Sequence, residues 1–219
     1  MLASRCIAAL SLAVSLLAAG RASAAPEPTT LPAIITAVQA TYSGVTAIRS
    51  DFQQTVKNAV TGVEEKQRGR LLLERPRKMR LELGLPLKSA VVSDGTTQWV
   101  YAADAKQVIV QKLLGTGSGV EKLIDDLGNL SELFDVTLVP PSIPPRPVHQ
   151  LTLKPKVAGG VRQLNLTIKR STFLLQDLDV VDAIGGVVKM SFSGMILGGD
   201  IPDAVFSFKP PPGVTVVQM

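Results

Sequence analysis

The feature that most constrains the fold is a series of segments in which apolar and polar residues alternate. The clearest alternations place apolar side chains at every second position in two stretches: Leu164, Leu166 and Ile168, then Val188, Met190 and Phe192. A period of two gives a strand with one apolar face. Such strands without intervening helices predict an antiparallel sheet that buries a single face.

Further strands are predicted at residues 49–60, 63–73, 78–83, 89–93, 98–102 and 107–111, with another alternation at 206–209. Two segments show helical spacing instead, residues 31–43 and 120–130. Many strands and only two helices predict a mainly β (α+β) fold. We expect a strongly curved antiparallel sheet that forms an open half-barrel, covered by a lid of short α-helices.

The first residues have the pattern of an export signal. Arg5 precedes an apolar run from Ile7 to Leu17, and small residues follow at 22–24. We therefore expect residues 1–24 to be a cleaved signal peptide and residues 25–219 to be a single domain; a retained N-terminal anchor is the alternative. The only cysteine, Cys6, lies within this signal, so the mature chain is expected to have no disulfide.

The charge of the chain argues against nucleic acid as a partner. The net charge of +5 falls to +3 without residues 1–24, which hold two arginines and no acidic residue. Clustered lysines and arginines with interleaved aromatic residues, typical of nucleic-acid binders, are missing from the sequence.

The sequence offers little for catalysis. His149 is the only histidine, so the usual zinc sites cannot be built, and we expect it on the surface of a strand. The glycine-rich residues 115–119 lack the lysine of a phosphate-binding loop, and we interpret them as a flexible hinge. Asp125 and Asp126 are predicted to form a solvated helix face. The prediction is therefore no enzyme, no metal site and no cofactor.

One arginine stands where an apolar residue is expected. Along the strand that begins at Gly69, alternation puts Leu71, Leu73 and Arg75 on the same side. The apolar side resumes beyond Pro76. A guanidinium on this face needs several acceptors, because burying an unpaired charge is costly.

Four motifs in order resemble the LolA family of periplasmic lipoprotein carriers. Along the chain they are Ser-Asp-Phe-Gln-Gln at 50–54, Gly-x-Leu-x-x-x-Arg-Pro at 69–76, Val-Ser-Asp-Gly-x-x-x-Trp-x-Tyr at 92–101, and the ending at 206–216, which is similar to the family's closing strand. The resemblance runs from about residue 31 to the end.

The resemblance implies a lid latch at Arg75. In the family, the arginine at the matching position donates hydrogen bonds to backbone carbonyls of the lid helices and holds the empty cavity shut. The acyl-chain cavity is then expected to be lined from the sheet by Leu71, Leu73, Met79, Leu81 and Leu83, and from the lid by Ile34, Val38, Leu123, Ile124 and Leu127. The pattern of the residues alone leaves open a dry core without a cavity.

The resemblance also implies a function, partners and a compartment. We expect a monomeric carrier in the periplasm that accepts acylated lipoproteins from an inner-membrane ATP-driven releasing complex and delivers them to an outer-membrane acceptor similar to LolB. Two alternatives keep the fold: a carrier of free lipid or glycolipid, and a lipoprotein-sensing regulatory domain.

Overall fold

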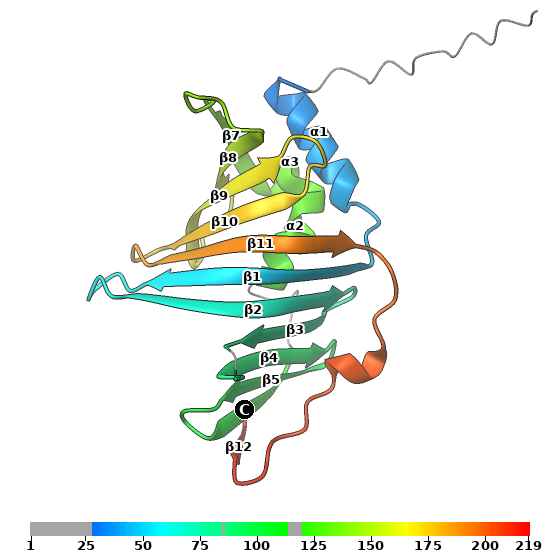
Figure 1. Cartoon of the computed structure of the whole chain (residues 1–219), viewed down its shortest axis with the longest axis vertical. Helices are drawn as coiled ribbons and strands as arrows, with labels where there is room; N and C mark the ends of the chain where they lie inside the picture. The colour runs from blue at the N-terminus through cyan, green and yellow to red at the C-terminus, as the bar shows by residue number, and fades with distance from the viewer. Residues whose placement is uncertain (1–27, 85, 114–119) are drawn as a thin grey trace, which may run out of the picture.

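The computed structural model describes residues 28–84, 86–113 and 120–219, with the side chains of residues 120, 121 and 123 outside that description (Figure 1). The described residues form one sheet of 12 strands in the order β12-β6-β5-β4-β3-β2-β1-β11-β10-β9-β8-β7. Neighbouring strands are antiparallel except for β12 and β6, which are parallel. The mainly β prediction is confirmed, whereas the strong curvature into a half-barrel stays a prediction.

The strands are β1 (Ala47–Lys57), β2 (Glu64–Glu74), β3 (Lys78–Leu83), β4 (Ser89–Asp94), β5 (Thr97–Ala102), β6 (Gln107–Lys112), β7 (Phe134–Val139), β8 (Val148–Pro155), β9 (Val161–Lys169), β10 (Leu175–Asp182), β11 (Val187–Leu197) and β12 (Thr215–Gln218). The helices are α1 (Leu31–Tyr42), α2 (Val120–Asp126), the 3-10 turn η1 (Leu127–Asn129), α3 (Leu130–Leu133) and the 3-10 turn η2 (Asp203–Phe206).

Helix α1 forms where the sequence predicts it. Pro32 stands at an early helical position, where its missing N–H has no helical partner to lose. Ile34, Val38 and Tyr42 are buried, and their spacing of four residues puts them on one face. The second helical segment is divided into α2, η1 and α3. Its buried residues Ile124, Leu127 and Leu130 still face the sheet together with those of α1.

The core lies between these helices and one face of the sheet. It joins the buried helical residues to alternate residues of the strands, among them Phe52, Leu71, Leu153, Leu166 and Phe192. Figure 1 shows α1, α2 and α3 gathered beside the same part of the sheet. Among the described residues, no helix is long and apolar enough to cross a membrane.

Close packing inside the sheet requires a glycine opposite Phe52. Phe52 pairs with Gly69 across β1 and β2. A Cβ atom at Gly69 would lie 2.1 Å from the carbonyl oxygen of Glu82 and 2.5 Å from the Phe52 ring. The first motif glycine therefore makes room for an aromatic ring and for a neighbouring strand.

The end of the chain differs from the prediction. Phe206 ends η2, and residues 207–209 are not a strand. Prolines follow at 210–212, and because proline lacks the N–H that a strand ladder needs, pairing begins only at Thr215. The segment from Gly198 to Ser207 instead crosses the outer face of the sheet, where Arg80 donates hydrogen bonds to the carbonyls of Val205 and Ser207.

Candidate functional site

Arg75 connects the turn between β2 and β3 to two helical elements. Its Nη1 donates hydrogen bonds to the carbonyl oxygen of Tyr42, the last residue of α1, at 3.1 Å and to that of Val45 at 2.6 Å. Its Nε donates to Asp125 Oδ1 of α2 at 2.7 Å. The carbonyl at the end of α1 carries partial negative charge and so suits a guanidinium. One side chain thus holds α1 and α2 against the same turn.

Backbone carbonyls are among the acceptors of Arg75, as expected, while the role of these contacts as a latch stays a prediction. Asp125 was predicted to lie on a solvated helix face; its carboxylate pairs with Arg75, with 45% of the Asp125 side chain and 30% of the Arg75 side chain exposed. The neighbouring carboxylates do not compete for Arg75, because Glu74 pairs with Lys78 and Glu82 with Arg80.

A second set of contacts joins α1 to the rest of the helical layer. Gln39 Nε2 donates to the carbonyl of Gly128 at 3.1 Å, and the Ser131 hydroxyl donates to Gln39 Oε1 at 2.9 Å. The helices therefore contact one another through polar groups at their outer side, while their apolar side faces the sheet.

Tyr42 anchors the end of α1 in the core. Its hydroxyl accepts a hydrogen bond from the backbone N–H of Leu175 at 2.8 Å, and its side chain is fully buried. Burial raises the pKa of Tyr42 from 10.0 to about 12, although the hydrogen bond from Leu175 acts to lower it. The tyrosine is therefore neutral at ordinary pH, and α1 is fixed at its C-terminal end by both Tyr42 and Arg75.

The expected cavity residues lie in one packed cluster. Seven of them are buried there: Ile34, Val38, Leu71, Leu73, Met79, Ile124 and Leu127. Leu81 and Leu83 are half-buried and pack against the cluster. The side chain of Leu123 is outside the described residues. Between helices and sheet, the space lined by Ile124 and Leu127 has only about 10 Å³, so the helices close tightly on the sheet in this conformation.

An apolar cleft opens beside this closed region. Its volume is about 460 Å³, within the range of about 300–1,000 Å³ that is typical of ligand pockets. Of the residues predicted to line an acyl-chain cavity, Leu81 lines this cleft. Its other lining residues are Gln54, Lys122, Asp126, Phe134, Pro155, Val157, Gly159, Gly160, Val161, Leu178, Val180, Val188 and Met190. Phe134 and Leu178 also line the small closed space, so the cleft adjoins the core beneath the helices.

The floor of the cleft follows from strand register. Leu178 pairs with Met190, and Val180 pairs with Val188, across β10 and β11. Alternation directs these four side chains to the face that α2 covers. The edge is polar, because Lys122 and Asp126 of α2 form an ion pair of 2.8 Å there. The cleft is therefore apolar at its floor and charged at its edge.

Sequence reasoning found the alternation of Val188 and Met190 but did not assign these residues to the site. Candidate site residues were chosen with the help of the resemblance motifs, and Val188 and Met190 lie outside all four of these motifs. The cleft residues of the β8–β9 hairpin, such as Val157 and Gly160, have no sequence motif, and only the pairing of distant strands reveals their position.

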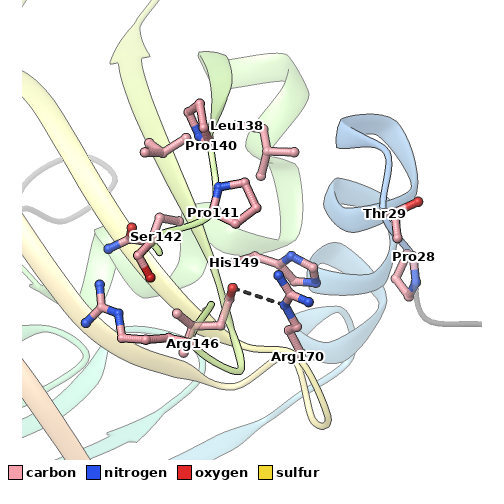
Figure 2. A pocket seen from close by; sticks show the side chains of 12 residues that line it. Pro28, Thr29, Leu138, Pro140, Pro141, Ser142, Arg146, His149 and Arg170 are labelled. Carbon is pink, nitrogen blue, oxygen red and sulfur yellow. Dashed lines mark hydrogen bonds between the residues drawn. The ribbon is translucent and has the colours of Figure 1, made fainter. Parts of the chain in front are cut away.

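A second cavity, of about 270 Å³, lies where the β7–β8 hairpin meets the residues before α1 (Figure 2). Arg146, His149 and Arg170 line it. Figure 2 shows Arg146 pointing away from the other two, while Arg170 Nε donates to the carbonyl of Val148 at 3.2 Å. The guanidinium groups therefore do not converge on a common anion.

The prediction that His149 lies on the surface is wrong. Only 6% of the residue is exposed, because it occupies the inward position of β8 next to Leu151 and Leu153, which are fully buried. Its ring stacks on Phe173, with centroids 6.2 Å apart. Within the described part of the chain, no group of three or more histidine, cysteine or acidic residues could hold a metal ion.

Comparison with known proteins gives consistent matches over most of the chain. Residues 43–209 match the family model described as outer membrane lipoprotein carrier protein LolA. An outer-membrane lipoprotein carrier protein of Bordetella pertussis is 30% identical over 209 residues, which cover 94% of this chain and 93% of that protein. One of Chromobacterium violaceum is 29% identical over 213 residues, covering 97% and 96%.

A solved structure supports the fold. An uncharacterized conserved protein of Thermus thermophilus superposes with a TM-score of 0.51 at 13% identity, covering 85% of this chain and 97% of that one. At this identity the likeness concerns the fold alone.

Proposed function

Since the chain belongs to the LolA family of outer membrane lipoprotein carrier proteins, we propose that it carries acylated lipoproteins through the periplasm and that acyl chains enter through the apolar cleft. In this proposal the chains come from an inner-membrane ATP-driven releasing complex and pass to an outer-membrane acceptor. The family is one of carriers, and the proposed role involves no covalent chemistry.

The observation that carries the proposal is the apolar cleft that adjoins a core closed by the Arg75 contacts. Burial of each methylene group contributes about 0.8 kcal/mol, so a cleft lined mostly by apolar side chains suits an acyl chain. The cleft shares Phe134 and Leu178 with the space beneath the helices. A chain that enters it can therefore extend into the core by moving the helices away.

The Arg75 contacts give such a carrier a means of release. Opening the helical layer breaks two hydrogen bonds and one ion pair, and this free energy is recovered when the cargo leaves. A closed state that competes with cargo lowers the apparent affinity by the fraction of molecules that are open. Moderate affinity is what transfer from one partner to the next requires.

The test is to fill the cleft. Val188→Trp places a large side chain on the half-buried floor, and Thr55→Trp places the same side chain on the opposite face of the neighbouring strand β1. We expect Val188→Trp to weaken binding of an acylated, fluorescent lipoprotein at least about tenfold, since it displaces several methylene contacts. Thr55→Trp serves as the control.

The outcomes separate the functions. Equal binding by both variants and the unchanged protein would refute the cleft as the acyl site. Binding of free fatty acid or glycolipid but not of the acylated lipoprotein would identify a lipid carrier instead. Circular dichroism of both variants checks that the fold is retained.

A further inference from the structure

Three hairpin turns meet at the end of the sheet where the apolar cleft opens. Lys57 at the end of β1 pairs with Val187 at the start of β11, which brings the β1–β2 and β10–β11 turns together. The N–H of Ala183 donates to the carbonyl of Gly160 at 3.1 Å, which joins the β10–β11 turn to the β8–β9 turn. Figure 1 shows the β1–β2 and β10–β11 turns reaching out on the same side.

Each of these turns presents an exposed aliphatic side chain. The exposed fractions are 88% for Val60, 82% for Val157 and 79% for Ile184. Isolated exposed apolar residues are ordinary on protein surfaces. Three at the tips of neighbouring turns, beside an apolar cleft that Val157 itself lines, form a more specific pattern.

Local hydrogen bonds fix two of these tips. Asn58 Oδ1 accepts hydrogen bonds from the N–H groups of Val60 and Thr61, at 2.9 and 3.0 Å. Asp182 Oδ1 accepts from the N–H groups of Ile184 and Gly186, at 3.0 and 2.7 Å. Because Asn58 and Asp182 cap the turns, the backbone at Val60 and Ile184 is held at the turn tips, where both side chains are exposed.

The third turn is basic. Residues 154–162 contain Lys154, Lys156 and Arg162 and no acidic residue, and all three basic residues are exposed. Two glycines, Gly159 and Gly160, complete the turn and have open space around them. Exposed cations beside apolar tips are the combination by which proteins bind the interface of an anionic bilayer.

We propose that these three turns dock on an anionic phospholipid bilayer and so place the mouth of the cleft against the membrane surface. The purpose of this docking, transfer of an acyl chain, rests on the proposed function. A protein partner of stable affinity needs a continuous complementary surface of about 1,000 Å² or more in total. Separate aliphatic tips around glycines do not provide one, but they can enter the headgroup layer independently.

The experiment is flotation of the mature protein with vesicles of phosphatidylcholine, with or without phosphatidylglycerol. We expect binding only where phosphatidylglycerol is present, and loss of binding as salt rises. Val60→Asp/Ile184→Asp and Lys154→Glu/Arg162→Glu should each weaken binding by about tenfold or more. None of these four residues lines the cleft, so both variants should still bind acylated lipoprotein in solution.

Matched controls use sites away from these turns. Ile143→Asp changes a residue with 99% exposure in the β7–β8 hairpin. Arg146→Glu/Lys169→Glu makes the same change of charge in that hairpin and at the far end of β9, again at exposed residues. Both controls should bind vesicles as the unchanged protein does.

Absence of vesicle binding, or equal loss in the controls and the turn variants, would overturn the proposal. Equal loss in the charge controls would show a general attraction of a basic protein to an anionic surface. Failure of the carrier proposal would appear differently, as an unchanged protein that binds no acylated lipoprotein in solution.

Discussion

The Arg75 contacts predict how two substitutions should alter cargo affinity. The ion pair with Asp125 is partly exposed, and such pairs contribute about 1 kcal/mol or less. Asp125→Asn retains an oxygen acceptor but removes the charge, so it should shift the balance of closed and open forms by no more than about fivefold. The apparent affinity for an acylated lipoprotein should rise by the same factor.

Arg75→Leu removes all three contacts and should act more strongly. The two hydrogen bonds to the carbonyls of Tyr42 and Val45 contribute about 1 kcal/mol each after competition with water. With the ion pair, the total is about 3 kcal/mol, or roughly 100-fold in the opening equilibrium. The variant should bind cargo more tightly and release it more slowly to acceptor membranes.

The assay is the equilibrium titration of a fluorescent acylated lipoprotein, followed by its rate of transfer to acceptor vesicles. Asp51→Asn is the control, because Asp51 pairs with Arg70 at 3.5 Å with both side chains mostly exposed, and it does not line the cleft. If Arg75→Leu folds normally but binds cargo with unchanged or lower affinity, the contacts do not oppose cargo binding and the reasoning is wrong.

Two further predictions concern stability. Gly69→Ala should lower the free energy of unfolding by about 1–3 kcal/mol in urea denaturation, because its Cβ would lie 2.1 Å from the backbone oxygen of Glu82. Gly159→Ala is the control, because Gly159 has open space around it, and it should change the free energy of unfolding little. Equal effects of the two substitutions would contradict the packing argument. The raised pKa of Tyr42, from 10.0 to about 12, means that the folded state holds this proton more tightly than the unfolded state. Its contribution, on the order of 2–3 kcal/mol, is complete below pH 10 and disappears as pH rises toward 12. Tyr42→Phe should lack that part of the alkaline decline, even though the loss of the acceptor for the Leu175 N–H lowers its stability at neutral pH. Denaturation midpoints of both proteins across this range measure the difference, and identical alkaline declines would refute the assignment.

The local parts of the fold could be predicted from the sequence because they depend on neighbouring residues. Alternation identified strands such as β9 and β11, and helical spacing identified the buried face of α1. The strand β7 was missed although Phe134, Val136 and Leu138 alternate, because it follows a helical segment without a break. The alternation of Phe206 with its neighbours indicated a strand, but Phe206 is buried instead against Ala47 and Ile201 on the outer face.

The candidate site also has a part that the local sequence predicts and a part that depends on distant segments. The position of Arg75 on an apolar face is local, and it correctly indicated that the side chain needs several acceptors. The partner Asp125 lies 50 residues away, and a pattern of adjacent carboxylates on a helix contains no information about which turn that helix will approach. The cleft depends on the pairing of β10 with β11 and on the β8–β9 hairpin, so its lining is a property of the assembled sheet.

The pairing of β1 with β11 has a consequence for the order of folding. Strands β2–β6 and β7–β11 each pair with neighbours along the chain, so both halves can form early from short loops. Ile48, however, pairs with Leu197, and the two halves cannot join before nearly the whole chain is present. A chain that becomes available from its N-terminus onward would therefore keep one edge of β1 unpaired until β11, which begins only at Val187, is present. During that interval the apolar face of the unfinished sheet is open to water, and a folding factor that covers unpaired strand edges would have its greatest effect then.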